Sequence, residues 1–223
     1  MKELYRKHCL FHGDIYNIVM FIVVPIVVVL LHIWMQSLID VLNVSNLAVL
    51  MMFVGMYADY YSFNGLTTKD YPLGIFKNSA KGREAIKWAI IADQIRRFVQ
   101  IVFIYIVCNA ITMKMLQVEL TSMDWILTLV CILFVYASIT TVILIGRNIT
   151  TFAAYTGFSG ILMSIAGVIV SLALFYRYCQ GEVDPMNWLP IVFVLAVFST
   201  GVMIKYTLYR YDRSFMEEKY HDK

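Results

Sequence analysis

Charged residues are scarce in this chain, and their scarcity limits what the protein can be. Of its 223 residues only 15% are Asp, Glu, Lys or Arg, whereas 61% are hydrophobic and the mean hydropathy is +0.73. Soluble domains carry about 25% charged residues, and one of this size cannot bury so much apolar surface. The composition therefore excludes a soluble domain, a disordered chain, a coiled coil and a disulfide scaffold. It indicates a membrane protein, and the net charge of +3 gives no sign of a nucleic-acid surface.

Six stretches are apolar enough to cross a membrane as helices. A crossing needs roughly 20 mostly apolar residues, because a helix rises 1.5 Å per residue and the hydrocarbon core is about 30 Å thick. The predicted helices are 15–35, 47–61, 98–116, 125–145, 151–176 and 188–208. The second is the shortest. The first is too long for a signal peptide and lacks a small-residue cleavage site, so we predict that it is retained.

The positions of the basic residues predict the orientation of these helices. With six crossings both termini lie on one side, and if that side is the cytoplasm, 16 of the 18 Lys and Arg residues are inside. Only Lys114 and Arg177 remain outside, together with five acidic residues: Asp40, Glu119, Asp124, Glu182 and Asp184. Basic residues accumulate on the cytoplasmic side of membrane proteins. We therefore predict a multi-pass protein of the cell (plasma) membrane with both termini cytoplasmic.

The sequence also lacks the residues of an enzyme. It contains no HExxH, GxSxG or paired-carboxylate motif and no GxxxxGK[ST] phosphate loop. The candidates for a functional ionisable residue within the apolar stretches are His32, Asp59 and Lys205, each near a predicted helix end where the side chain reaches the headgroups. For Asp59 we favour this interfacial role over a buried functional carboxylate. We predict no catalytic site and no cofactor in this chain.

The cysteine and histidine residues give little further indication of function. Cys9 is predicted on the cytoplasmic side, Cys108 and Cys131 inside membrane helices, and Cys179 outside, so no pair forms a structural disulfide and we interpret all four as packing residues. His8 and His12, with Cys9 between them, have the one metal-like spacing in the chain. No fourth ligand is near, so we favour surface residues of an interfacial helix over a zinc site and predict no metal.

The connections between the helices are unequal, and only residues 62–97 have room for structure of their own. Residues 1–14 mix Leu4, Tyr5 and Phe11 with basic residues, which predicts a short interfacial helix. Residues 205–223 form a predicted cytoplasmic tail. We find no repeat, linker or low-complexity segment, so we predict one transmembrane domain over 1–223.

The loop 62–97 is predicted to hold a short helix and then the start of a longer one. Thr67 with Asp70 three residues later resembles a capping box, and Pro72 is tolerated in the first turn of the helix that this box would open. Leu73, Ile75 and Phe76 give that helix an apolar surface that it cannot bury alone. A second helix is predicted to begin near Arg83 and to run straight into the third membrane helix. Its charged residues are predicted to be wet or at headgroup level: Lys87, Asp93, Arg96 and Arg97.

The fifth predicted helix is rich in small residues. Gly157, Gly160, Ser164 and Gly167 belong to pairs spaced four apart, which let another helix approach closely. Packing inside one bundle and a role at a subunit interface or in a pathway are equally compatible with this pattern. At 26 residues the stretch is also longer than a crossing requires, so a break or a re-entrant end is possible.

These features together resemble the permease subunits of type-2 ABC transporters. The topology resembles that family over the whole chain, and the motif resembles it over 67–97, where Lys69-Asp70, Leu73 to Phe76, Ser79 to Arg83 and Ile86-Lys87 stand at the expected places. The chain departs from the family in having no proline within Asn78-Ser79-Ala80, and its short connection before the last helix leaves little room for the family's re-entrant hairpin.

The resemblance implies a function and partners. It implies that the loop helix is a coupling helix that docks on a separate ABC ATPase subunit through Asp70, Tyr71, Leu73, Ile75, Phe76, Lys77 and Arg83. ATP and Mg would be bound by that subunit, and a second permease, the same chain or a related one, would complete the transporter. Compact permeases of this kind are similar to Gram-positive exporters of small amphipathic or toxin peptides. The alternatives are an ABC exporter of a lipid or drug-like molecule and a non-transporting membrane immunity or processing protein.

Overall fold

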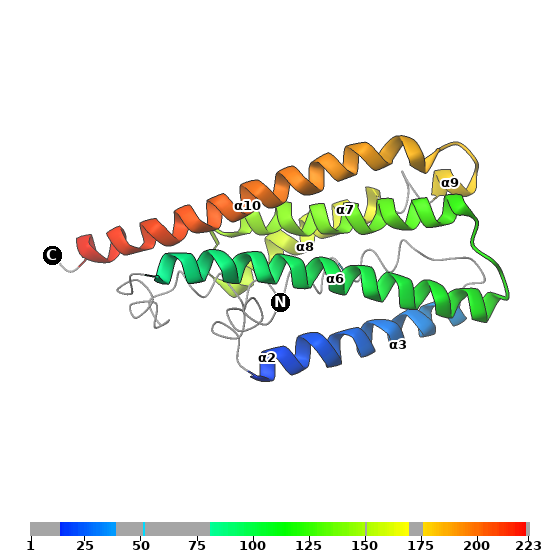
Figure 1. Ribbon diagram of the computed structural model, residues 1–223, viewed down its shortest axis with the longest axis horizontal. Helices are drawn as coiled ribbons and strands as arrows, with labels where there is room; N and C mark the ends of the chain where they lie inside the picture. Colours follow the sequence, from blue (N-terminus) through cyan, green and yellow to red (C-terminus); the bar gives the residue numbers. More distant parts are fainter. Residues whose placement is uncertain (1–13, 39–50, 52–80, 150, 170–175, 222–223) are drawn as a thin grey trace.

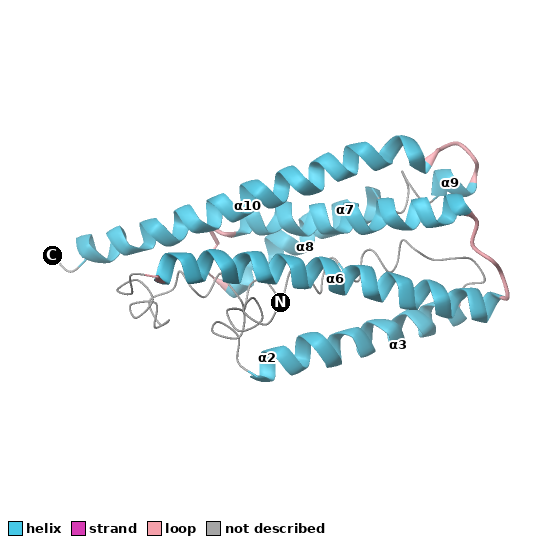
Figure 2. Cartoon of the chain, in the orientation of Figure 1, coloured by secondary structure: helices cyan, strands magenta, loops and turns pink. Residues whose placement is uncertain are grey.

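A computed structural model describes residues 14–38, 51, 81–149, 151–169 and 176–221 (Figure 1). All regular secondary structure in this part of the chain is helical (Figure 2). The elements are α2 (Asp14–Ile18), the π-helical segment η1 (Val19–Val23), α3 (Val24–Ser37), α6 (Gly82–Leu116), α7 (Ser122–Gly146), α8 (Phe152–Val168), α9 (Arg177–Cys179) and α10 (Pro185–His221).

Within the described residues, four helical stretches are long and apolar enough to cross a membrane. They are Tyr16–Ser37, Gly82–Leu116, Ser122–Gly146 and Pro185–Asp212. They contain the predicted helices 15–35, 98–116, 125–145 and 188–208 almost completely, so those four predictions are confirmed as apolar helices of sufficient length. The described part of the chain is thus an all-α structure of the kind that membrane proteins have.

The other two predicted crossings are only partly described. The helix predicted at 151–176 corresponds in part to α8, an apolar helix of 17 residues. Residues 170–175 lie outside the described ranges, so the break or re-entrant end considered for this helix stays a prediction. Of the helix predicted at 47–61, the structure describes Met51, which is helical and buried. Residues 1–13 of the predicted interfacial segment 1–14 and residues 62–80 of the predicted loop 62–97 also lie outside the described residues.

Helix α7 is the centre of the bundle. In its most apolar window 67% of the residues are buried, against 17 to 33% in the other three long stretches. Its most extensive contacts are with α10, and it also packs on α8 and α6, while α3 packs on α6 (Figure 1). The fully buried side chains at these contacts include Ile101, Ile104, Tyr105, Leu127 and Ile139.

Helices α6 and α10 extend well beyond their predicted crossings. α6 begins at Gly82, which confirms the prediction of a helix that starts near Arg83 and continues into the membrane. α10 continues to His221, so residues 205–221, predicted as a tail, are the end of the last helix. The reason lies in the sequence: no proline or glycine interrupts it between Gly201 and His221.

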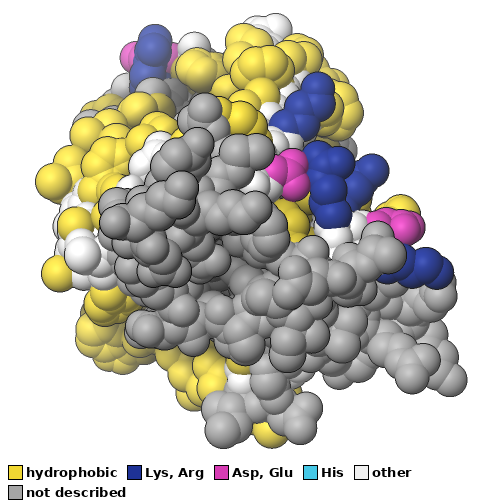
Figure 3. All heavy atoms as spheres, turned by 90° about the vertical axis from the view of Figure 1, so that its left-hand side faces the viewer, with side chains coloured by type: hydrophobic (Ala, Val, Ile, Leu, Met, Phe, Trp, Pro, Cys, Tyr) yellow, Lys and Arg dark blue, Asp and Glu magenta, His cyan; other side chains and the backbone are white. Residues whose placement is uncertain are grey.

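The helix ends collect at two opposite ends of the bundle (Figure 1). One end brings together the start of α6, the end of α7, the start of α8 and the end of α10; we call it the basic end, because Lys81, Arg83, Lys87, Arg147 and Arg210 belong to it. Viewed from this side, Lys and Arg side chains gather in one region with acidic residues among them (Figure 3). The opposite end contains the turn between α6 and α7, α9 and the start of α10.

A capping box begins α7 at that opposite end. The Thr121 hydroxyl accepts a hydrogen bond from the backbone N–H of Asp124, and the Asp124 carboxylate accepts one from the backbone N–H of Thr121. The same carboxylate accepts a 2.7 Å hydrogen bond from the hydroxyl of Tyr178, within α9. Burial and this hydrogen bond raise the pKa of Tyr178 to about 12, so the phenol remains a donor at neutral pH.

Candidate functional site

Most residues predicted to contact an ATPase lie outside the described ranges. These are Asp70, Tyr71, Leu73, Ile75, Phe76 and Lys77. The one that is described, Arg83, occupies the first turn of α6 and forms a two-point ion pair with Asp212 of α10. Its Nε donates to Oδ1 at 3.0 Å and its Nη2 to Oδ2 at 2.8 Å. Arg83 therefore connects the start of α6 to the end of α10.

A small apolar cluster completes this connection. Ile86, Ala89 and Ile90 of α6 pack with Tyr211 of α10 and are fully or nearly fully buried. The three α6 residues follow the i, i+3, i+4 spacing of one helix face. Because these contacts precede the apolar part of α6, the last part of the predicted loop 62–97 packs on the bundle.

Three charged residues predicted to be wet are in fact buried. Asp93, Arg96 and Arg97 have side-chain exposures of 0%, 5% and 3%. Arg96 Nη2 donates to Asp93 Oδ1 at 2.6 Å, and Arg97 Nη2 donates to Oδ2 at 2.7 Å. The prediction of headgroup exposure is wrong for these residues, because the i, i+3 and i, i+4 spacing lets one carboxylate pair with both guanidinium groups inside the bundle. We call them the Asp93 triad.

The Asp93 triad also connects α6 to the first helix. The guanidinium of Arg96 lies 6.0 Å from the ring centre of Tyr16, and its Nη1 donates to Gln100 Oε1 at 2.9 Å. Gln100 in turn donates to the backbone carbonyl of Met20 at 2.6 Å, within η1. The opposite charges at i, i+3 and i+4 between apolar residues were the sequence signal for this cluster.

Two more polar residues differ from their predicted setting. His32 was predicted to reach the headgroups, but it is 3% exposed and its Nε2 lies 2.8 Å from the hydroxyl of Thr112 on α6. Arg147, which is among the 16 basic residues counted as cytoplasmic, is 2% exposed and donates to the hydroxyl of Thr207 on α10 at 3.2 Å. Lys205, in contrast, is exposed as predicted. His32 and Arg147 are buried because the fold places hydroxyl groups of other helices beside them.

The small residues of α8 divide between two faces. Gly167 is buried, while Gly157 and Ser164 are exposed and Gly160 is partly exposed. A Cβ atom added at Gly157 or Gly160 would meet no heavy atom within 4 Å. The buried face of α8 therefore packs inside the bundle, and the face with Gly157 and Ser164 stays open on this chain.

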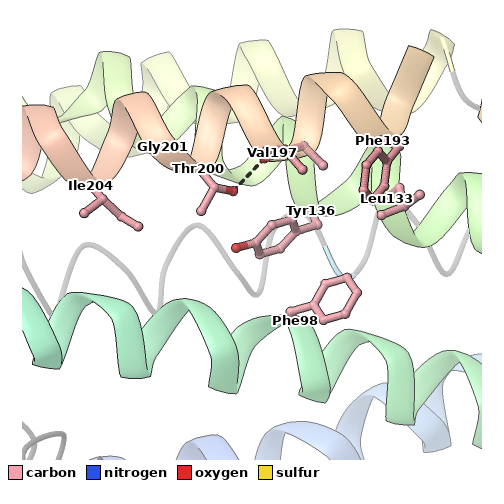
Figure 4. Close-up of a pocket in the computed structure, with 9 residues that line it drawn as sticks. Phe98, Leu133, Tyr136, Phe193, Val197, Thr200, Gly201 and Ile204 are labelled. Atoms are coloured by element: carbon pink, nitrogen blue, oxygen red, sulfur yellow. Dashed lines mark hydrogen bonds between the residues drawn. The ribbon is translucent and has the colours of Figure 1, made fainter. Parts of the chain in front are cut away.

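An apolar groove runs along the bundle between α6, α7 and α10 (Figure 4). Its volume is about 430 Å³, and its lining residues are Phe98, Leu133, Tyr136, Phe193, Ala196, Val197, Thr200, Gly201 and Ile204. Phe193 and Val197 are 56% and 59% exposed, so the groove is open to the surroundings. On its inner side the rings of Phe98 and Tyr136 pack edge to face, with their centres 5.3 Å apart.

No metal centre is formed by the described residues, among which no three His, Cys, Asp or Glu side chains cluster. His8, Cys9 and His12 lie outside these residues. Cys108 and Cys131 are buried and free, which fits packing residues, but Cys179 is exposed, so packing does not explain it.

Comparisons with known proteins found no relative of this chain. No protein-family model, no curated protein and no solved structure matches this chain.

Proposed function

We propose that this chain is the membrane-spanning subunit of an ATP-driven ABC exporter. In this proposal it pairs with a second permease and with separate ATPase subunits, and it moves small amphipathic, antimicrobial or toxin peptides out of the cell by alternating access. The chain itself binds no ATP or Mg and catalyses no reaction. It crosses the membrane six times, with both termini and the loop 62–97 in the cytoplasm.

The observation that carries the proposal is the continuity of α6. The helix follows the predicted coupling segment directly and runs unbroken from Gly82 to Leu116, about 50 Å at 1.5 Å per residue. A crossing needs only about 30 Å. The extra length places the start of α6 beyond the apolar region, so a force on the loop would move a rigid rod that spans the bundle.

The contacts at the start of α6 support the same mechanism. Arg83 with Asp212 and the cluster around Ile86 and Tyr211 connect α6 to α10, while the Asp93 triad and Gln100 connect it to the first helix. A displacement of the loop would therefore reach three helices at once. Such a movement changes transport only if substrate or nucleotide binds the two arrangements with different affinity.

The first experiment tests the interface with the ATPase. If a neighbouring reading frame encodes an ABC ATPase, the full chain is expressed with that ATPase, and the complex is purified by a tag on the ATPase. We expect Leu73→Asp and Phe76→Asp to reduce the amount of this chain recovered at least tenfold, because each puts a charge into an apolar contact. Asn78→Asp adds the same charge at a polar position of the same loop and is the matched control. Recovery that neither apolar substitution changes would contradict the interface.

The second experiment separates an exporter from a binding protein. The complex is placed in vesicles, and ATP hydrolysis and peptide accumulation are measured with and without an amphipathic peptide. An exporter hydrolyses ATP faster with peptide and accumulates it, whereas a non-transporting immunity or processing protein binds its partner and does neither. A complex that responds to lipid or drug-like molecules instead would establish the alternative cargo.

A further inference from the structure

The apolar groove has the shape and chemistry of a lipid site, and we propose that it binds one acyl chain of an anionic phospholipid, with Lys205 next to the phosphate. The site does not depend on the transport function proposed above, but it rests on the orientation proposed there, with the basic end in the cytoplasm. It depends on the three helices that line the groove, on its length, and on the charge at one of its ends.

The length of the groove corresponds to one leaflet. Along α10 the lining extends from Phe193 to Ile204, which is a rise of about 16 Å at 1.5 Å per residue. Half of a hydrocarbon core of about 30 Å is about 15 Å. A single acyl chain that begins at the headgroup level and ends at the bilayer centre would therefore run the whole length of the groove.

The volume of the groove favours an acyl chain over a helix of a partner protein as the occupant. A helix segment of the same length, with a diameter of about 10 Å, occupies roughly 1,200 Å³, whereas the groove encloses about 430 Å³. A transmembrane helix of a partner would therefore lie across the opening and leave the groove unfilled. Gly201 lines the groove at an open position, where an added Cβ would meet no heavy atom within 4 Å.

The two ends of the groove differ in polarity. No charged residue occurs between Phe193 and Ile204 on α10, and the first one after the groove is the exposed Lys205, one turn beyond Gly201. On the α7 side the hydroxyl of Tyr136 donates to Gln94 Oε1 at 3.3 Å. The groove thus runs from an apolar middle toward the basic end, where polar groups and a cation stand at its edge.

This polarity matches an anionic lipid of one leaflet. The cytoplasmic leaflet carries the anionic headgroups, and a Lys near that surface contributes about 1 kcal/mol to electrostatic attraction. Lysine stems lie along apolar surface while the ammonium group stays in water. Lys205 can therefore reach a phosphate without leaving the edge of the groove.

Native mass spectrometry of the purified full chain tests the proposal. Palmitoyl-oleoyl phosphatidylglycerol and palmitoyl-oleoyl phosphatidylcholine are added in turn at equal concentration, and the bound fraction of each is measured. We expect phosphatidylglycerol to bind about fivefold more tightly than phosphatidylcholine. Lys205→Gln should remove this preference and leave the binding of phosphatidylcholine unchanged.

Filling the groove tests the position of the acyl chain. Gly201→Leu should reduce the binding of both lipids at least fivefold, because the new side chain occupies the space beside Gly201. Gly157→Leu makes the same change at another open glycine and should bind both lipids like the natural protein. Val197→Trp, at an exposed lining position, fills the same groove and replaces Gly201→Leu if that variant does not fold by circular dichroism.

Three results would overturn the proposal. The first is equal binding of the two lipids to the natural protein. The second is lipid binding that neither Gly201→Leu nor Val197→Trp reduces. The third is a change in oligomer mass with these variants while lipid binding is unaltered, which would show that a second copy of the chain covers the groove.

Discussion

The Asp93 triad combines two buried positive charges with one carboxylate. Removing charges from water costs several kcal/mol per ion, and close pairing offsets that cost only while both partners are present. Arg83 and Asp212 form a pair of similar length, but their side chains are 71% and 41% exposed, and exposed pairs contribute about 0–1 kcal/mol. The Asp93 triad and the Arg83–Asp212 pair therefore differ in burial and not in the distance between their charged atoms.

The triad gives the first prediction at the residue scale. Asp93→Asn leaves Arg96 and Arg97 buried without their carboxylate, and we expect it to lower the free energy of unfolding by about 3–5 kcal/mol. Thermal unfolding of the purified protein, followed by circular dichroism, measures the loss. Asp212→Asn is the matched control and should change stability by less than about 1 kcal/mol. Equal effects of the two substitutions would show that the triad is hydrated.

A close contact of glycine gives the second prediction. A Cβ atom at Gly146, the last residue of α7, would lie 2.6 Å from Cε2 of Tyr155 on α8, whose side chain is fully buried. We expect Gly146→Ala to destabilise the protein by about 1–3 kcal/mol, since the ring cannot move without displacing its neighbours. Gly157→Ala, with no atom within 4 Å, should be neutral or slightly stabilising in the same unfolding measurement. A neutral Gly146→Ala would mean that α8 moves freely against α7.

At the scale of elements, the contact between α7 and α10 is the most extensive in the bundle. Apolar packing dominates it, and the buried hydroxyls of Thr140 and Ser199 lie 2.7 Å apart across it. Hydrogen bonds between membrane helices contribute less than their burial suggests, because the separated helices also find partners. Packing therefore accounts for most of the stability of this contact.

A double-mutant cycle measures the hydrogen bond between these helices. Thr140→Val and Ser199→Ala are made singly and together, and the coupling energy from unfolding is expected at about 0.6 kcal/mol, with about 1.7 kcal/mol as an upper bound. Thr141→Val is the control partner, because Thr141 donates to the Ala137 carbonyl of its own helix. Its coupling with Ser199→Ala should be near zero. A coupling energy near zero for Thr140 as well would mean that this hydrogen bond does not form in the membrane.

At the scale of the whole molecule, the two ends of the bundle carry different charge. The basic end includes the starts of α6 and α8 and the ends of α7 and α10, and the opposite end includes the acidic residues around Asp124 and α9. If the distribution of Lys and Arg sets the orientation, as the positive-inside rule states, the opposite end faces the outside. Cys179 at that end is exposed, so its labelling shows on which side of the membrane the end lies.

Thiol labelling of intact cells tests this orientation. A membrane-impermeant maleimide should label Cys179 from outside, because Cys108 and Cys131 are buried, and Cys179→Ser should abolish the signal. Burial and the charge of Asp124 raise the pKa of Cys179 above its usual value of 9.0. Less thiolate is therefore present at neutral pH than on an unperturbed cysteine, and the rate should rise as the pH is increased. Labelling of Cys179 only after the cells are permeabilised would reverse the proposed orientation.

Prediction from the sequence was accurate for the four long helices that the structure describes and inaccurate for the environment of several polar side chains. Apolar runs determine where helices form, because each needs only its own residues to satisfy the backbone in a membrane. The burial of His32 depends on Thr112, eighty positions later in the chain, and that of Arg147 depends on Thr207. Such distant partners leave no local pattern. Of the predicted coupling residues, the described part of the chain includes Arg83 alone, so the coupling role stays a prediction.

The sequence alone was enough to identify an apolar, helical, membrane-type chain with few charges, because the number and length of apolar stretches depend only on residues that are neighbours in the chain. The tertiary structure decided what the few charges do. Asp93, Arg96 and Arg97 are internal because α6 turns them toward one another and toward the first helix, while Lys205 is external because α10 turns it away from α7. The groove beside Lys205 exists only where α6, α7 and α10 meet, and its shape depends on how the side chains of three separate segments pack together.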